Sequence, residues 1–471
     1  MRTKPRLNQA LVILFLILIA SPIILIAQGS YSVRLKINQL EEDTIYIKTF
    51  YGDKTLIADT IAIDSHGYFV FETDKAHKGL ATASLRYEDL FSFILDSNPR
   101  FSIEINPNGE AYIEGCDANQ LFFEYQTANI NYSKAVAEIR KGINKENQDS
   151  LLSLYNQIQT GYMRYQQDFF STYPNHIMTS IIKSLKEPEI PKKFFIGEGL
   201  DTNRLDEIAY YFRMSFWNNF DFADLRLIQT PYFYPKFNAY FSEVSSMDPD
   251  SIAVSLRDLI VEANKRDKTY TYSKFAFEHH IKKYRNVPFS WHEGIYRNII
   301  QLIAEQGHTP WLDSQELGIY KKEVEYLDKI AQGAEFPNIK GMGLDKNIYS
   351  LSDYSDKYLV VYFYSASCSS CKFGLDEFEE FYKEIGKDIG MEVIGIDLDY
   401  NESAAIEYAK ERGFEWNTIK AIPEDIINDY GIDVFQTPDL YLLDNNRNIL
   451  YHAPKYETIV DYLKRSEGLI D

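Results

Sequence analysis

The chain has 471 residues, 45% of them hydrophobic and 25% charged, a balance typical of a folded protein of more than one domain. Its formal net charge is −20, and it contains no run of lysine and arginine residues. Because contacts with phosphates need clustered cations, this composition disfavours nucleic acid as a partner. The three cysteines, Cys116, Cys368 and Cys371, are too few to indicate a protein stabilised by a framework of disulfides.

The first 28 residues have the pattern of an export signal. Arg2, Lys4 and Arg6 precede an apolar run over residues 11–20, and an imperfect small-residue cleavage site lies before Gln28. The run is short for a membrane span, which needs about 20 residues. We therefore expect residues 1–28 to be a signal peptide and the protein to be exported to the periplasm or cell envelope. An uncleaved anchor, with membrane association through this segment, stays open as the alternative.

Residues 29–116 are expected to form a β-rich domain. Val33, Leu35 and Ile37 alternate with polar residues, the period of a half-buried strand. Further apolar segments, such as 91–95 and 101–105, are separated by turn-forming residues. Short strands at this spacing predict a small antiparallel sandwich or barrel. We expect Cys116, at the end of this segment, to be buried and unreactive, as free cysteines commonly are.

Residues 117–332 are expected to form a helical middle domain. Apolar residues recur there at helical spacing, and Ile252, Leu256, Leu259 and Ile260 form one such stripe. The aromatic-rich segment 230–241 is interpreted as core packing rather than as a ligand groove.

Residues 333–471 alternate between strand and helix patterns. The nearly continuous apolar run 358–366 predicts a central strand buried on both faces, and a second such run begins at Met391. Between them, apolar residues recur at intervals of three and four from Leu375 to Ile389, which predicts a helix. This order predicts an α/β domain.

Cys368 and Cys371 lie between the first strand of this domain and the predicted helix. A helix N-terminus stabilises an anionic sulfur, and only a thiolate attacks a disulfide. We therefore predict that Cys368 begins the helix and is the nucleophile, and that Cys371, inside the first turn, resolves the mixed disulfide. A zinc site is disfavoured, because the chain has no second C-x-x-C and no pair of histidines at H-x(3–5)-H spacing.

Several motifs in this order resemble the TlpA/ResA-like, exported branch of the thioredoxin fold. They are the strand, C-x-x-C and helix unit, the added strand and helix "MEVIGIDLDYNESAAIEYAKERG", and "QTPDLYLLDNNRNIL". The resemblance covers roughly the last 30% of the chain. It implies a redox-active disulfide between Cys368 and Cys371, a cis Pro438 beside that pair, and a Thr437 backbone that binds an extended substrate strand. It implies neither a metal nor another cofactor.

The chain departs from the family pattern at three positions. Ser367 stands where thioredoxins usually have tryptophan, Tyr362 where they have a buried acid, and Gly374 where ResA-like reductases have glutamate. The general acid or base for the resolving thiol is therefore unidentified. Upstream, the β-rich segment resembles a domain of unknown function found ahead of TlpA-like modules. Residues 218–237 resemble the helical segment that often follows that domain.

The sequence thus predicts a multidomain exported thiol–disulfide oxidoreductase that acts as a reductase. Its expected partners are envelope proteins that carry disulfides or thiols, and an unknown electron donor. One alternative is an envelope binding or scaffold protein whose thioredoxin module is not catalytic. A further alternative is a disulfide isomerase.

Overall fold

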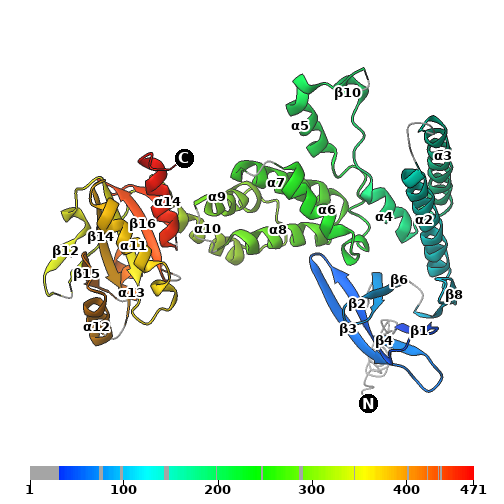
Figure 1. Ribbon diagram of the computed structural model, residues 1–471, viewed down its shortest axis with the longest axis horizontal. Helices are drawn as coiled ribbons and strands as arrows, with labels where there is room; N and C mark the ends of the chain where they lie inside the picture. Colours follow the sequence, from blue (N-terminus) through cyan, green and yellow to red (C-terminus); the bar gives the residue numbers. More distant parts are fainter. Residues whose placement is uncertain are drawn as a thin grey trace, which may run out of the picture. The chain divides into compact units, whose positions relative to one another are not determined.

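The computed structural model describes residues 31–470, except 74–77, 96–98, 143–147, 198, 246–247, 286–289, 344, 400–401, 422, 433, 435–436 and 454. The predicted export signal, residues 1–28, lies outside the described residues. The chain divides into two compact units, Met1–Asn238 and Ala239–Asp471 (Figure 1). Within the described part of the chain, every helix is too short or too polar to cross a membrane.

Two four-stranded sheets form the β-rich domain of the first unit. Their strand orders are β4-β1-β7-β8 and β3-β2-β5-β6. Inward-facing residues of both sheets, among them Val33, Ile45 and Phe93, share one core, so the predicted sandwich is confirmed. The strands are β1 (Tyr31–Ile37), β2 (Thr44–Tyr51), β3 (Lys54–Ala62), β4 (Phe69–Thr73), β5 (Gly79–Ser84), β6 (Asp89–Leu95), β7 (Arg100–Ile105) and β8 (Ala111–Glu114).

One strand pair of this domain corrects the expectation of an antiparallel sandwich. Strands β1 and β7 run parallel, whereas the other pairs of the two sheets are antiparallel. Parallel neighbours cannot be joined by a tight hairpin. The chain between them instead passes through β2 to β6, which include the whole second sheet.

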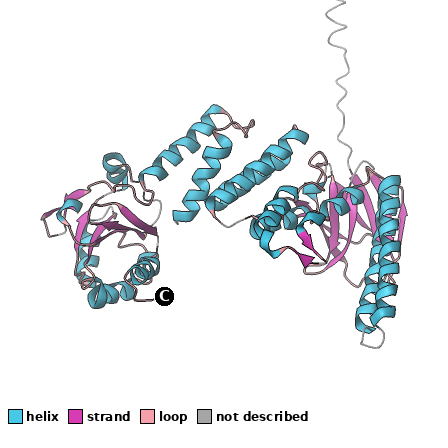
Figure 2. Ribbon diagram, turned by 90° about the horizontal axis from the view of Figure 1, so that it is seen from above, coloured by secondary structure: helices cyan, strands magenta, loops and turns pink. Residues whose placement is uncertain are grey.

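The helical part of the first unit begins with two long helices that lie side by side, α2 and α3 (Figure 2). The rings of Tyr132 and Tyr162 stack between them, with centroids 4.2 Å apart. Cys116 is buried just before α2, and the Asn119 side chain donates a hydrogen bond to its sulfur over 3.3 Å. The elements are α2 (Asp117–Gly142), α3 (Gln148–Thr172), α4 (Ile177–Leu185), β9 (Phe195–Ile196), β10 (Gly199–Leu200), α5 (Leu205–Ser215) and α6 (Phe233–Ala239).

The α-helices α7 to α10 lie in the N-terminal part of the second unit. In α7 the predicted stripe of Ile252, Leu256, Leu259 and Ile260 is buried. Helix α10 starts with a capping box between Asp313 and Glu316, which satisfies two backbone N–H groups of its first turn. These helices are α7 (Pro249–Arg266), α8 (Thr271–Tyr284), α9 (Ser290–Ile299) and α10 (Ser314–Lys329).

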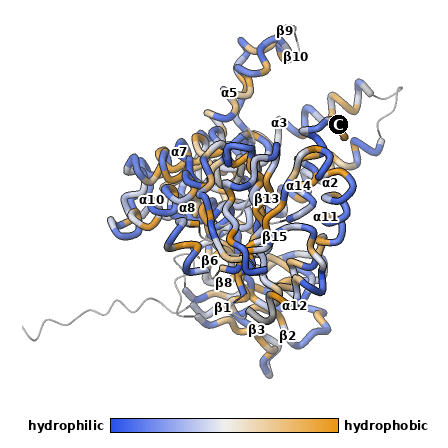
Figure 3. The backbone as a smooth tube through the Cα atoms, turned by 90° about the vertical axis from the view of Figure 1, so that its left-hand side faces the viewer, coloured by the Kyte–Doolittle hydropathy of each residue, from blue (hydrophilic) through white to orange (hydrophobic). Residues whose placement is uncertain are grey.

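The C-terminal part of the second unit is built on a five-stranded sheet with the order β15-β14-β13-β16-β17. Strand β13 is parallel to β14 and antiparallel to β16. All seven residues of β13 are buried, and Figure 3 shows hydrophobic stretches where this strand is labelled. The elements are β11 (Lys340–Met342), β12 (Ile348–Ser350), β13 (Tyr358–Tyr364), α11 (Leu375–Phe381), β14 (Met391–Asp397), α12 (Glu402–Arg412), β15 (Asn417–Lys420), α13 (Pro423–Asp425), β16 (Asp439–Asp444), β17 (Ile449–Ala453) and α14 (Tyr456–Ser466).

Side chains of β13 alternate between two cores, one on each face of the sheet. Tyr362 and Tyr364 point into the core that contains Cys371 and residues of α11 and α14. Val361 and Phe363 point into the opposite core, which also contains Ile330 from the end of the α10 segment. A central strand covered on both faces is the arrangement predicted for residues 333–471, and the predicted thioredoxin fold is confirmed.

Candidate functional site

The loop that carries the two cysteines follows β13 directly. The backbone N–H of Cys368 donates to the carbonyl of Ser365 over 3.0 Å, and Ser370–Lys372 form a single 3₁₀ turn. Helix α11 begins only at Leu375. The prediction that Cys368 begins the α-helix and that Cys371 lies in its first turn is therefore wrong.

Gly374 explains why the helix starts later. Its φ of +77° lies in the left-handed region, which interrupts a right-handed helix between the cysteines and Leu375. A Cβ atom at this position would lie 3.2 Å from Oε1 of Glu457 and 3.5 Å from the Tyr456 ring. The glycine that replaces the family's glutamate thus allows the start of α14 to approach the loop.

Cys368 is the more exposed of the two cysteines. Its sulfur accepts a hydrogen bond from the backbone N–H of Cys371 over 3.1 Å, and its thiol donates to the carbonyl of Thr437 over 3.2 Å. The first of these contacts supplies a backbone donor to the sulfur although the α-helix starts later. A partly exposed sulfur with such a donor suits attack on a disulfide.

Cys371 is fully buried in the core between α11, α14 and the sheet. Burial, followed by its hydrogen bond with Cys368, raises the pKa of the Cys371 thiol from 9.0 to about 12. Both cysteines are free thiols in this structure.

Two buried tyrosines lie next to the backbone of Cys371. The hydroxyl of Tyr456 donates to the Cys371 carbonyl over 2.8 Å and lies 2.5 Å from the hydroxyl of Tyr362. Burial raises the pKa of Tyr362 well above its ordinary value. Tyr362, at the position of the family's buried acid, therefore contributes a neutral hydroxyl. Tyr456 was missed by sequence reasoning because it belongs to no motif.

A carboxylate on the neighbouring strand end fixes the loop before Cys368. Asp399 accepts hydrogen bonds from the hydroxyls of Ser365 and Ser367, over 2.8 and 3.1 Å, and from the backbone N–H of Ala366. Ser367, which stands where thioredoxins usually have tryptophan, thus donates a hydrogen bond to this carboxylate. Because parallel strands β13 and β14 end at the same edge, the "DLD" sequence, which begins at the last residue of β14, was the signal that could have identified Asp399.

A second carboxylate, that of Asp397, contacts the backbone of Asp399. The backbone N–H of Asp399 donates to Oδ1 of Asp397 over 2.9 Å, and Nζ of Lys420 lies 3.3 Å from the same oxygen. The Asp397 side chain is fully buried, and this burial raises its pKa. The pair of Asp397 and Lys420 thus anchors the end of β14 from which Asp399 extends.

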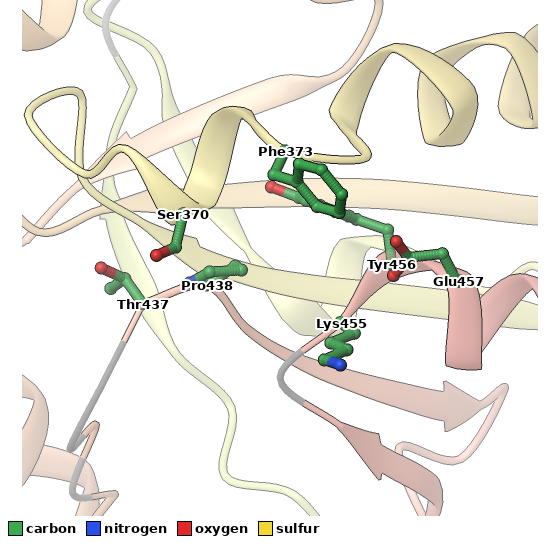
Figure 4. A pocket seen from close by; sticks show the side chains of 7 residues that line it. All are labelled: Ser370, Phe373, Thr437, Pro438, Lys455, Tyr456 and Glu457. Carbon is green, nitrogen blue, oxygen red and sulfur yellow. The ribbon is translucent and has the colours of Figure 1, made fainter.

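Thr437 and Pro438 lie beside the cysteines, and the peptide bond between them is cis, in agreement with the family resemblance. Both residues line a pocket of about 370 Å³ together with Ser370, Phe373, Lys455, Tyr456 and Glu457 (Figure 4). The structure therefore brings the four predicted site residues together. Among the described residues, no cluster of three or more histidine, cysteine or acidic side chains is arranged to hold a metal ion.

Two regions of the chain match models of known protein families. Residues 332–452 match the AhpC/TSA family, and residues 146–329 match a domain of unknown function (DUF5106). The predicted thioredoxin-like domain at the C-terminus is thus confirmed. No curated protein matches the chain.

Several solved structures are similar to part of the chain. A thioredoxin-like protein from Bacteroides caccae is 20% identical and covers 59% of this chain and 97% of its own, with a TM-score of 0.47. The thioredoxin domain of a thiol–disulfide oxidoreductase from Bacteroides vulgatus is 27% identical and covers 28% of this chain and 97% of its own, with a TM-score of 0.25. A putative thiol:disulfide interchange protein from Chlorobium tepidum is 18% identical and covers 28% and 96%, with a TM-score of 0.26.

Proposed function

We propose that this thioredoxin-like protein is an exported thiol–disulfide oxidoreductase that reduces disulfides of envelope proteins. The observation that carries the proposal is the asymmetry of the two thiols. The sulfur of Cys368 is partly exposed and accepts a backbone hydrogen bond, whereas Cys371 is fully buried and has a pKa of about 12. One thiol is thus suited to attack and the other to resolution.

In the proposed reaction, the Cys368 thiolate bonds to one sulfur of the substrate disulfide, and the other substrate sulfur leaves as a thiolate. Cys371 then loses its proton, bonds to the Cys368 sulfur and releases the second substrate thiol. The substrate gains two electrons, and the Cys368–Cys371 pair becomes a disulfide. A dithiol donor must supply two electrons to return the pair to the reduced state.

The hydrogen bond from the Cys368 thiol to the Thr437 carbonyl supports a role for Thr437 and Pro438 in the substrate groove. The backbone beside the cis bond lies where a segment that presents its disulfide to Cys368 must pass. Export to the periplasm or cell envelope belongs to the proposal because of the basic and apolar pattern of residues 1–28.

Trapping with single-cysteine variants tests the proposal. Cys371→Ser is expected to accumulate mixed disulfides with envelope proteins, because attack proceeds and resolution cannot. Cys368→Ser is expected to trap nothing and to lack disulfide reductase activity. If both variants retain the thiol chemistry of the wild type, the module is not catalytic, and the binding or scaffold alternative replaces the proposal.

The reduction potential of the Cys368–Cys371 pair tests the direction. A potential near the roughly −270 mV of thioredoxin supports a reductase, and a potential near the roughly −120 mV of strong oxidants would contradict it. Equilibration with glutathione buffers, followed by mass spectrometry, provides the measurement.

A further inference from the structure

The pocket beside Cys368 contains an unusually exposed aromatic side chain. Phe373 is 78% exposed although it lies only two residues after the buried Cys371. Its backbone N–H donates to the carbonyl of Ser370 over 3.2 Å, and Gly374 follows it in the left-handed region. The backbone thus holds Phe373 on the surface, where its exposed ring is hydrated and gains free energy when another apolar group covers it.

Three rings line this pocket: the exposed ring of Phe373 and the buried rings of Tyr456 and Pro438. In Figure 4 the ring of Phe373 lies over Tyr456, and the Pro438 ring lies on the other side of the pocket, below Ser370. The volume of about 370 Å³ is at the lower end of the range of small-ligand sites, which starts at about 300 Å³. A space of this size between rings accepts one side chain, and aromatic groups gain from packing against such rings.

Charge gives no reason for an ionic occupant. Lys455 and Glu457, which carry opposite charges, both line the pocket and are both exposed. Within the described part of the chain, neither side chain forms an ion pair with another residue. Their charges offset each other, so the pocket favours a neutral group.

The pocket is next to the reactive sulfur, to which it is linked through Thr437. Thr437 lines the pocket, and its carbonyl accepts the hydrogen bond of the Cys368 thiol. A polypeptide that presents a disulfide to Cys368 therefore passes the mouth of the pocket. We propose that this pocket is a specificity subsite that binds an aromatic side chain adjacent to the reacting cysteine of a protein substrate. This inference rests on the proposed disulfide exchange.

The test uses pre-reduced full-length protein in single turnovers. Two matched peptides, with phenylalanine or asparagine beside their cysteine, are each joined through a disulfide to mercaptoethanol. Cys368 bonds to the peptide sulfur and mercaptoethanol leaves, after which Cys371 bonds to Cys368 and releases the peptide thiol. Acid quenching and mass spectrometry give the rate, and hydroxyethyl disulfide serves as a probe that cannot fill the pocket.

We expect the wild type to react at least tenfold faster with the phenylalanine peptide than with the asparagine peptide. Phe373→Ser should reduce this preference to less than twofold, and its rate should fall more with the phenylalanine peptide than with hydroxyethyl disulfide. Phe373→Leu, which keeps an apolar side chain, should retain an intermediate preference. The matched control is Ile348→Ser, because Ile348 on β12 is equally exposed, at 78%, and does not line the pocket.

The possible failures are distinguishable. Equal rates for the two peptides in the wild type, with hydroxyethyl disulfide reduced normally, would overturn the subsite and leave the proposed function intact. An equal loss of preference in Phe373→Ser and Ile348→Ser would also overturn it, since the preference would then come from general surface hydrophobicity. Absence of reaction with all three disulfides would overturn the proposed function, and the subsite with it.

Discussion

The burial of Cys371 gives a quantitative prediction for its chemical reactivity. Burial raises its pKa from 9.0 to about 12, three units, so its thiolate fraction at pH 7 should fall about a thousandfold relative to an unperturbed cysteine. Because alkylating reagents attack the thiolate, the reaction rate of Cys371 should fall strongly; the greater nucleophilicity of a more basic thiolate offsets part of the thousandfold loss, and burial of the side chain slows the reaction further. The rate should then rise about tenfold per pH unit without a plateau below pH 11.

The assay uses variants with one reactive cysteine each. In Cys116→Ser/Cys368→Ser the thiol of Cys371 stands alone, and burial, the largest cause of its raised pKa, persists. Iodoacetamide labelling between pH 6 and 11, followed by mass spectrometry, gives the rate profile, and unfolding in guanidinium provides the unperturbed reference. The companion variant Cys116→Ser/Cys371→Ser should be labelled faster at pH 7, because the Cys368 side chain is partly exposed. A plateau for folded Cys371 below pH 9.5, or faster labelling of Cys371 than of Cys368, would refute the reasoning.

The raised pKa of Cys371 also predicts how the stability of the protein depends on pH. The folded-state pKa of Cys371 is above that of the unfolded chain, so its contribution is complete below about pH 9 and is lost as the pH rises toward 12. Cys371→Ala should therefore lose less stability than the wild type over this window, as measured by denaturant unfolding at pH 8 and pH 11. An identical loss in both proteins would show that Cys371 does not ionise on unfolding.

Three further predictions concern residues around the cysteines. Tyr456→Phe should cost about 1–3 kcal/mol of unfolding free energy, because it leaves the Cys371 carbonyl and the Tyr362 hydroxyl without this hydrogen-bond partner. Tyr362→Phe removes only one of these contacts and should cost less. Denaturant unfolding that gives the reverse order would contradict the assigned hydrogen bonds. Asp399→Ala should cost about 1–3 kcal/mol of unfolding free energy and change the labelling rate of Cys368. Asp399→Asn, which keeps a hydrogen-bond acceptor, should have smaller effects on both quantities. Equal effects of the two substitutions would argue against a role of the loop hydrogen bonds. A fragment 314–471 should be more stable than a fragment 333–471, because only the longer fragment contains Ile330, whose burial contributes about 1.5–3 kcal/mol. Equal melting temperatures of the two fragments would place Ile330 outside the core.

The α/β architecture at the C-terminus was predictable because its signals are local and strong. The seven residues of β13 are apolar or aromatic and all buried, and the apolar residues after them recur at helical spacing. The start of α11 was not predictable from that spacing. It depends on the left-handed conformation of Gly374 and on the approach of Glu457, which lies 83 residues further along the chain.

In the site, too, local motifs were predictable and contacts between distant segments were not. The C-x-x-C spacing identified Cys368 and Cys371, and the resemblance identified Thr437 and Pro438. Two other site residues contact segments that are distant in sequence. Asp399 binds the loop before Cys368, and Tyr456 binds the Cys371 carbonyl. A single sequence gives no pairing information for such contacts, and only the strand register and the path of α14 reveal them.

The parallel pairing of β1 with β7 has a consequence for the order in which the β-rich domain can fold. Strand β1 is an inner strand of its sheet, and its two neighbours, β4 and β7, end at residues 73 and 105. While the chain is being synthesised, β1 therefore keeps both of its hydrogen-bonding edges unpaired until β4 follows, and one of them until β7 follows. Such non-local pairing requires the closure of a long loop before it gains contacts, which slows folding. The sheet β3-β2-β5-β6 needs no strand beyond residue 95, so it can assemble first and provide the surface on which the β1 sheet is completed.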